Sequence, residues 1–254
     1  MHPEAYEMLA RRQKTYWWHR ARRSLALTLL RQHGAPEGCR WIDIGCGPGG
    51  NLHLLDDLHP VLTVGVDVSD IALSLAAAAA PSATLVKADI NARLPFPDRS
   101  FDVATVFNVL YHAWVVSERN VLIEIARIVR PGGLLLLTEP AFDLMRRRLD
   151  EIVLTRRRYR RRDFAEWLDA AGFEELFSSY FTSFAVPAVL AAKLLRRRIN
   201  GSSVAQRSID TRMLPEIVNR ALFHVATLES AVILRGVRMP VGTTLISISR
   251  RRVA

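Results

Sequence analysis

Cysteine is scarce in this sequence: its 254 residues include two, Cys39 and Cys46. Both lie beside one short apolar segment, without the spacing of metal ligands and in too small a number for a disulfide framework. The sequence therefore predicts no metal site. It also indicates a reducing compartment, and we expect a cytoplasmic protein.

Long apolar runs are missing as well. The N-terminus is charged and lacks the apolar core of a signal peptide, and no stretch approaches the roughly 20 apolar residues of a membrane span. With 50% hydrophobic and 24% charged residues, the composition is that of a globular protein. The length suffices for one large domain, or one domain with an extension, around a sheet buried on both faces.

Acidic residues are outnumbered by basic ones, 25 to 35, which gives a net charge of +10. Much of the excess is arginine, in clusters at residues 146–148, 156–158, 160–162, 196–198 and 250–252. A basic chain can bind nucleic acid, an anionic membrane surface or an acidic substrate, but arginines on solvated faces produce the same composition. We favour the last explanation.

The segment from Trp41 to Gly50 carries the strongest pattern. Apolar residues around Asp43 predict a short buried strand, and the glycines at 45, 47, 49 and 50 predict a turn into a helix. Glycine allows a ligand to approach backbone that a side chain would block. The spacing also matches the Gly-x-Gly-x-x-Gly pattern of dinucleotide-binding proteins. The turn alone therefore leaves open a nicotinamide or flavin cofactor and S-adenosylmethionine.

Three aspartates at successive strand ends favour S-adenosylmethionine. Asp43 precedes the first glycine, where a carboxylate suits the ammonium of an amino acid better than a pyrophosphate. Asp67 ends the next predicted strand and suits a ribose diol with either ligand. Asp89 ends the third, where it could accept a hydrogen bond from the adenine amine, with Ile90 against the ring.

Four motifs together resemble the series found in class I S-adenosylmethionine-dependent methyltransferases, closest to the small-molecule enzymes of the ubiquinone and menaquinone biosynthesis type. They are residues 43–50, 65–67, 87–89 and 130–133, within a match over roughly residues 39 to 140. The resemblance implies S-adenosyl-L-methionine as cofactor and S-adenosyl-L-homocysteine as product. The expected cofactor-binding residues are Asp43, Gly45, Cys46, Gly47, Gly49, Asn51, Asp67, Val68, Asp89, Ile90, Asn108, Trp18, Arg20 and Arg23.

Strands and helices alternate along the chain, which predicts a doubly wound α/β fold. The expected strands are 40–45, 62–67, 83–89, 101–107, 134–138, 173–184 and 243–249, and the expected helices include one begun at Gly50. The resemblance implies a seven-stranded, mostly parallel Rossmann-like sheet with an antiparallel last strand. We divide the chain into an N-terminal helical lid (1–34), the cofactor-binding domain (35–185), a helical insertion (186–239) and the last strand (240–254).

Two segments outside the sheet have alternative interpretations. Residues 16–23 are similar to a His-Trp-Trp-x-Arg-x-Arg-Arg signature of a bacterial methyltransferase subgroup, with Tyr16 in place of the histidine. They could close over the cofactor with Arg20 or Arg23 near its carboxylate, or form a helix packed on the sheet. The insertion could cover the substrate, form a dimer contact or, at residues 184–198, lie on an anionic membrane.

His112 is the expected general base, because it follows the fourth strand at the edge where such folds bind ligands. Asp150 and Tyr159 lie in a segment similar to a subgroup pattern of an aspartate, a histidine and Arg-Arg-Tyr, and are further catalytic candidates. Thr155 stands where that histidine would be, so its role cannot be transferred. A purely structural role stays open for all three candidates.

The segment 108–112 lacks the Asn-Pro-Pro-Tyr or Asp-Pro-Pro-Tyr pattern of enzymes that methylate amino groups of nucleic acids. We expect methylation of a small molecule, most simply at a hydroxyl, in a secondary-metabolite, saccharide or lipid-linked pathway of a bacterium. The alternatives are N- or C-methylation, an RNA-directed enzyme that uses the arginine clusters, and a cofactor-binding scaffold without an acceptor site. We expect a monomer or a homodimer.

Overall fold

The computed structural model describes residues 3–146, 150–151, 153–198 and 214–253. Its centre is a seven-stranded sheet in the order β3-β2-β1-β4-β5-β7-β6. Strands β1 to β5 pair in parallel, and β7 is antiparallel to both β5 and β6, which confirms the predicted fold class. The strands are β1 Arg40–Ile44, β2 Leu62–Asp67, β3 Thr84–Lys87, β4 Phe101–Phe107, β5 Val129–Pro140, β6 Phe173–Phe181 and β7 Thr244–Arg251.

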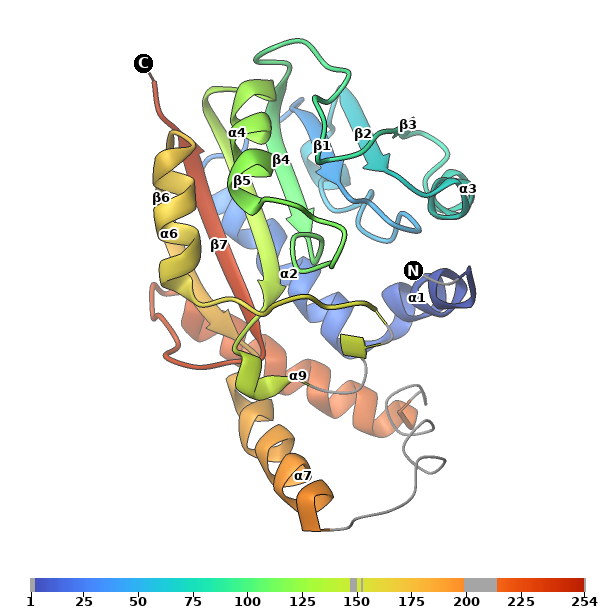
Figure 1. Cartoon of the computed structure of the whole chain (residues 1–254), viewed down its shortest axis with the longest axis vertical. Helices are drawn as coiled ribbons and strands as arrows, with labels where there is room; N and C mark the ends of the chain where they lie inside the picture. Colours follow the sequence, from blue (N-terminus) through green and yellow to red (C-terminus); the bar gives the residue numbers. More distant parts are fainter. Residues whose placement is uncertain (1–2, 147–149, 152, 199–213, 254) are drawn as a thin grey trace.

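Helices cover both faces of this sheet, with α4 and α6 on one side and α2 and α9 on the other (Figure 1). Leu122 of α4 and Phe164 of α6 pack with Ile42 of β1, whereas Leu25 of α2 and Ile233 of α9 pack on the opposite face. The helices are α1 Pro3–Thr15, α2 Trp17–Gln32, α3 Asp70–Ala79, α4 Glu118–Ile128, α6 Arg161–Ala170, α7 Val186–Arg198 and α9 Glu216–Leu234, with 3-10 turns η1 Asp56–Leu58, η2 Asp143–Met145 and η3 Ser183–Ala185.

Serine side chains cap two of the helices. The Ser69 hydroxyl accepts a hydrogen bond from the Ala72 amide (3.3 Å), and the Ser117 hydroxyl accepts one from the Asn120 amide (3.3 Å). Each satisfies an amide that the first turn of a helix leaves without an intrahelical partner. These caps fix where α3 and α4 begin at the carboxyl edge of the sheet.

The prediction of a helix beginning at Gly50 is wrong. Residues 50–58 form a series of turns closed by bonds between residues three apart, such as the Leu54 amide to the Asn51 carbonyl (2.8 Å). Leu52 packs with Ala76 beneath α3, whereas Leu54 packs with the cluster beneath α2. Residues two apart in an α-helix point about 200° apart. The tighter turns allow these leucines to enter their separate clusters.

Strand ends also differ from the predictions. β3 ends at Lys87, earlier than predicted. β6 ends at Phe181, because Thr182 adopts a left-handed conformation (φ 62°) that leads into η3. β5 is longer than predicted and begins at Val129, so residues 130–133 lie within the strand and not in a separate turn. A shift of register between the Phe101 and Val103 pairs accommodates the extra residues.

Contrary to the sequence expectation, one helix in the described part of the chain, α9, is long and apolar enough to cross a membrane by length and composition. Core helices of soluble proteins have the same properties. α9 packs along α2, and its Asn219 side chain accepts a hydrogen bond from the Trp17 amide (2.9 Å). On its outer side Ile217 and Leu228 are 80% and 70% exposed. Membrane contact, the oligomeric state and the cytoplasmic location stay predictions.

Candidate cofactor and substrate site

A cavity of about 340 Å³ lies at the carboxyl ends of β1, β2 and β4, which we call the inner cavity. The glycine turn after β1 forms part of its wall, with residues of α1, α2 and the segments after β4 and β5 around the rest. Its lining residues include Met8, Leu9, Trp18, Arg22, Gly45, Cys46, Gly47, Asn51, Asp67, Asn108, His112, Asp150 and Thr155. Ligands of doubly wound sheets bind at this edge.

The glycine turn presents bare backbone to the inner cavity. Gly45 and Gly47 have φ angles of +71° and +54°, which side chains rarely tolerate. A methyl group on Gly45 would lie 2.4 Å from a methyl carbon of Val109, whereas one on Gly47 would meet only Leu9, at 3.9 Å. Gly45 is therefore required for packing, and Gly47 leaves room for a ligand beside the backbone.

Asp67 holds this turn from the end of β2. One carboxylate oxygen accepts a hydrogen bond from the Gly47 amide (2.9 Å) and the other accepts one from the Ser69 amide (2.9 Å). Burial raises the pKa of Asp67 above its ordinary value, and these amides oppose the shift. As a cavity-lining acceptor, Asp67 has the position and chemistry that a ribose diol requires.

Arg22 of α2 is the most deeply buried cation at the site, although it is not one of the predicted cofactor-binding residues. Its guanidinium donates to the side-chain oxygens of Asn108 (2.6 Å) and Asn51 (3.1 Å). It also lies 4.7 Å from the ring centres of both Trp18 and Phe107. Burial lowers the pKa of Arg22 to about 9.

Two buried acids balance this charge. Asp43 accepts a hydrogen bond from the Thr105 hydroxyl (2.7 Å), and burial raises its pKa to about 7. Glu139, at the end of β5, accepts hydrogen bonds from the amides of Val109 (3.0 Å) and Leu110 (2.9 Å), and burial raises its pKa to about 8. Arg22 attracts both carboxylates electrostatically. Because Glu139 binds the amides of Val109 and Leu110, it also holds the segment that leads to His112.

Asp43 is completely buried and does not line the inner cavity, so the structure does not bring it to the surface that an ammonium group would contact.

The other predicted residues near the strand ends have local contacts. Asp89 is exposed and accepts hydrogen bonds from the amide (2.9 Å) and the side chain (2.8 Å) of Asn91, and Ile90 lies in the core below. Val68 is 43% exposed. Gly49 permits a close approach to α3, since a methyl group there would lie 2.8 Å from the Cα atom of Ala76.

Neither predicted arginine lines the inner cavity. Arg20 is exposed and lies over the Phe223 ring of α9 (4.4 Å). Arg23 donates to the Gln13 carbonyl (2.7 Å) and joins α2 to α1. Of the aromatic run, Trp18 does line the cavity, and its indole donates to the Thr244 hydroxyl (3.2 Å).

α1 lies against the glycine turn, where a lid was expected. The Gln13 side chain accepts a hydrogen bond from the Gly50 amide (3.0 Å), and a methyl group on Gly50 would lie 2.2 Å from the same Gln13 oxygen. Met8 and Leu9 line the inner cavity from this helix. The sequence contains no local signal for these contacts, because they depend on how α1 turns back onto the sheet.

His112 lines the inner cavity and pairs with Thr155 across an isolated β-bridge. Its Nδ1 atom lies 2.8 Å from the Val153 carbonyl, which selects the tautomer with a proton on Nδ1 and leaves Nε2 as the basic nitrogen. Burial lowers the pKa of His112 to about 4, so the imidazole is neutral at physiological pH. The structure thus brings a histidine beside the position where Thr155 replaces one.

The other two catalytic candidates differ in position. Asp150 lines the inner cavity and accepts two hydrogen bonds from the Arg158 guanidinium (2.8 and 2.9 Å). Tyr159 is fully buried and does not line the inner cavity; its hydroxyl lies within hydrogen-bond distance of two acceptors that share its single proton, the Leu110 carbonyl (2.7 Å) and Glu118 (2.8 Å). These bonds support a structural role for Tyr159 in holding the segment before His112.

Buried polar atoms around the inner cavity allow a test of the expected cofactor. The buried atoms of cavity-lining residues that have no hydrogen-bond partner within the described part of the chain include His19 Nδ1 and Arg22 Nε. Buried donors and acceptors are rarely left unsatisfied in folded proteins. A ligand that carries an acceptor group, such as the carboxylate of S-adenosylmethionine, fits the unsatisfied Arg22 donor. We find no group of three or more potential metal ligands among the described residues.

Comparison with known proteins agrees with this chemistry. Residues 42–137 match the family described as "Methyltransferase domain". The chain is 32% identical over 128 residues to a trans-aconitate 2-methyltransferase of Azoarcus sp. (strain BH72), covering 48% of this chain and 49% of that protein. It is 33% identical over 110 residues to a 27-O-demethylrifamycin SV methyltransferase of Amycolatopsis mediterranei (strain S699), covering 39% and 38%. The chain thus spans half or less of the length of these relatives.

A solved structure extends the likeness to the whole fold. It is a Haloferax volcanii methyltransferase in complex with the methyltransferase activator Trm112, with a TM-score of 0.66, 19% identity and coverage of 99% of this chain and 96% of that one. At this identity the likeness concerns the fold alone. Residues 42–137 therefore form a methyltransferase domain, and the glycine turn, Asp67 and the reversed last strand agree with these matches in supporting a class I S-adenosylmethionine-dependent methyltransferase.

Proposed function

We propose that this protein transfers the methyl group of S-adenosylmethionine to a hydroxyl group of a small molecule. The observation that carries the proposal is a neutral histidine, His112, on the wall of the same cavity as the glycine turn and Asp67. A hydroxyl acceptor must lose a proton as it is methylated, and a positioned base accelerates such a step by typically 10²–10⁴-fold. The relative named for 27-O-demethylrifamycin SV supports an oxygen acceptor.

Residues on three sides of the inner cavity would hold the cofactor. The backbone of Gly45 and Gly47 admits it closely, Asp67 accepts hydrogen bonds from its ribose, and Arg22 binds its carboxylate. When bound, S-adenosylmethionine supplies a methyl group already activated by the sulfonium. Alignment of the reacting groups can lower a barrier by about 7–11 kcal/mol, so positioning is the main task of the protein.

His112 then acts on the acceptor. The Val153 carbonyl holds the proton of Nδ1, and Nε2 takes the proton from the acceptor hydroxyl. The low pKa of His112 makes it a weak base but keeps it unprotonated across the physiological range. Asp150 fixes Arg158 nearby and serves to position the wall of the cavity.

The test is methyl transfer from labelled S-adenosylmethionine to sets of hydroxyl and amine compounds and to RNA. We expect label in a hydroxyl compound, and we expect His112→Gln to reduce turnover by about 10²-fold while S-adenosylhomocysteine still binds. His224→Gln, on the exposed side of α9, is the matched control and should leave turnover unchanged. Full turnover by His112→Gln would overturn the base assignment, and label in RNA or in amines would overturn the acceptor class.

A further inference from the structure

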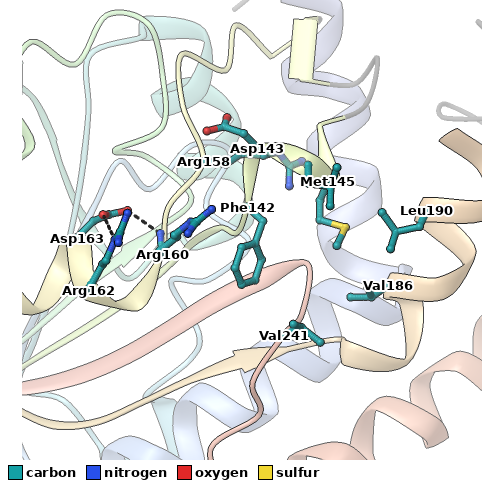
Figure 2. A pocket seen from close by; sticks show the side chains of 11 residues that line it. Phe142, Asp143, Met145, Arg158, Arg160, Arg162, Asp163, Val186, Leu190 and Val241 are labelled. Carbon is teal, nitrogen blue, oxygen red and sulfur yellow. Dashed lines mark hydrogen bonds and ion pairs between the residues drawn. The ribbon is translucent and has the colours of Figure 1, made fainter. Parts of the chain in front are cut away.

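A second cavity, of about 560 Å³, lies beside the inner cavity, and we call it the outer cavity. It is enclosed by η2, the first turns of α6 and α7 and the segment before β7 (Figure 2). No residue of the glycine turn lines it. Its lining residues are Phe142, Asp143, Leu144, Met145, Arg158, Arg160, Arg162, Asp163, Val186, Leu190 and Val241.

One part of the outer cavity is apolar. Met145 and Val186 are 4% and 8% exposed, and Leu190 lies beside them on α7 (Figure 2). Phe142 packs on the Tyr180 ring with centres 4.5 Å apart, which fixes this wall to β6. Such a wall suits an aliphatic or isoprenoid group, because binding removes apolar surface from water.

The opposite end carries positive charge. Arg160 and Arg162 lie together at the start of α6, across Phe142 from the apolar residues (Figure 2). The guanidinium of Arg160 lies 6.0 Å from the Phe142 ring centre. Arg162 is 74% exposed and, among the residues that the structure describes, makes a long ion pair with Asp163 (3.8 Å). The Asp163 carboxylate also accepts a hydrogen bond from the Arg160 amide (2.7 Å). Both guanidinium groups can therefore reach an anion at the mouth of the cavity.

The two cavities share a wall. Arg158 lines both, and its guanidinium is held by Asp150 and by the Ala141 carbonyl (3.0 Å). Neighbouring residues of α7 also divide between them, with Val189 on the inner cavity and Leu190 on the outer one. A molecule bound in the outer cavity therefore lies next to the proposed site of methyl transfer.

We propose that the outer cavity binds an amphipathic organic anion, with a carboxylate or phosphate at Arg160 and Arg162 and an apolar body along Phe142, Met145 and Leu190. Resting on the proposed function, we further infer that this anion is the acceptor substrate. Arg160 and Arg162 then select substrate charge.

Two methionines allow each cavity to be observed separately, since Met145 lines the outer cavity and Met8 the inner one. Methyl-¹³C-methionine spectra of the full chain, assigned with Met145→Leu and Met8→Leu, are recorded with decyl phosphate, decanoate, decyltrimethylammonium, inorganic phosphate and S-adenosylhomocysteine. We expect the two amphipathic anions to shift Met145 and not Met8. Comparable affinity for the cationic amphiphile, or a shift of Met8 by decyl phosphate, would overturn the site.

Variants test the arginines. Replacing Arg160 and Arg162 with alanine together should weaken decyl phosphate binding about tenfold, since charge-assisted bonds are lost. Asp163→Asn should strengthen it, because it removes the competing carboxylate and keeps an acceptor for the Arg160 amide. Arg119→Ala, an exposed position on α4, is the matched control. Unchanged binding by the double variant would overturn the proposal.

Titrations with decanoate and decyl phosphate distinguish a carboxylate head group from a phosphate one. Inorganic phosphate alone tests whether binding requires an apolar body. If inorganic phosphate bound as well as decyl phosphate, the apolar wall would have no role and the proposal would fail. If Met145 responded to the anions but Met8 did not respond to S-adenosylhomocysteine, the outer site would stand and the proposed function would fail.

Discussion

Replacing Arg22 with methionine should destabilise the protein strongly at alkaline pH and weakly at acidic pH. The reason is the pair of buried acids, Asp43 and Glu139, whose folded-state pKa values are about 7 and about 8. At about pH 6 both acids are mostly protonated and need no counter-charge. At about pH 8.5 Asp43 is ionised and Glu139 largely so, and Arg22 is a positive charge that attracts both.

The magnitude follows from opposing contributions. The variant loses charge-assisted hydrogen bonds to Asn108 and Asn51, worth about 1.5–3 kcal/mol each, but it also relieves the burial cost that lowers the pKa of Arg22. At about pH 6 we expect these contributions to cancel to within about 1 kcal/mol. At about pH 8.5 the two acids in the variant must stay protonated above their wild-type pKa values, which costs up to about 2–3 kcal/mol at about 1.36 kcal/mol for each pKa unit.

Proton linkage gives the same pH dependence of stability. Asp43 has a raised folded-state pKa, so its contribution to stability is most favourable below its unfolded value of about 3.9 and declines as pH rises to about 7. Removal of Arg22 raises that pKa further, because the cation no longer favours the charged form. The decline in stability should therefore extend to higher pH in the variant.

The assay is urea unfolding of the wild type and the variant at both pH values. Arg23→Met is the matched control, since Arg23 is half-buried on the same helix but donates to the Gln13 carbonyl. Its effect should be about 1 kcal/mol and nearly independent of pH. Equal destabilisation of Arg22→Met at both pH values, or the same pH dependence in Arg23→Met, would refute the reasoning.

Three further predictions concern the glycine turn, Glu139 and His112. Gly45→Ala should lower the free energy of unfolding by about 2–4 kcal/mol in urea titrations, because its methyl group would collide with Val109. Gly132→Ala is the control: Gly132 has a φ of +79° and open space around it, so this change should cost about 1 kcal/mol. Equal costs for the two variants would contradict the role of Gly45 in packing. Glu139→Gln should stabilise the protein relative to the wild type at about pH 9 and have little effect at about pH 6, because the raised pKa of Glu139 means that its charge is unfavourable in the folded state. Thermal melts in which the variant is less stable than the wild type at about pH 9 would refute this. Burial lowers the pKa of His112 to about 4, so protonation of His112 should cause no loss of kcat above about pH 5. A fall in kcat centred near pH 6.5 that disappears in His112→Gln would show that the histidine titrates normally and would contradict this.

The sheet was predictable because its strands are short apolar runs of the kind buried on both faces. β2 and β4 begin and end where the sequence predicts, since Asp67 and Asn108 follow apolar segments directly. The series of turns after Gly50 was not predictable in this way. Its leucines serve two separate clusters, and an apolar pattern alone does not reveal that division.

The candidate site was predictable where function requires a particular backbone. The glycine turn and Asp67 line the inner cavity because a strand end and a turn fix their positions. The choice among Arg20, Arg22 and Arg23 depends on the phase of α2. Arg22 follows Ala21 on its buried face, whereas Arg20 points to solvent. Helical spacing from Trp18 to Arg22 would have provided that signal.

Asp89 shows a different limit. A carboxylate at the end of a strand can bind a ligand or accept hydrogen bonds from its own loop, and the sequence does not separate these roles. In the structure Asp89 accepts both hydrogen bonds from Asn91. Local bonding of this kind is common for aspartate in turns.

The most direct test of the account is a calorimetric titration of the full chain with S-adenosylhomocysteine and, separately, with a nicotinamide dinucleotide. The account predicts that one molecule of S-adenosylhomocysteine binds per chain, that the methyl signal of Met8 shifts, and that Arg22→Met weakens this binding by at least about tenfold. Binding of the dinucleotide with no binding of S-adenosylhomocysteine would contradict it.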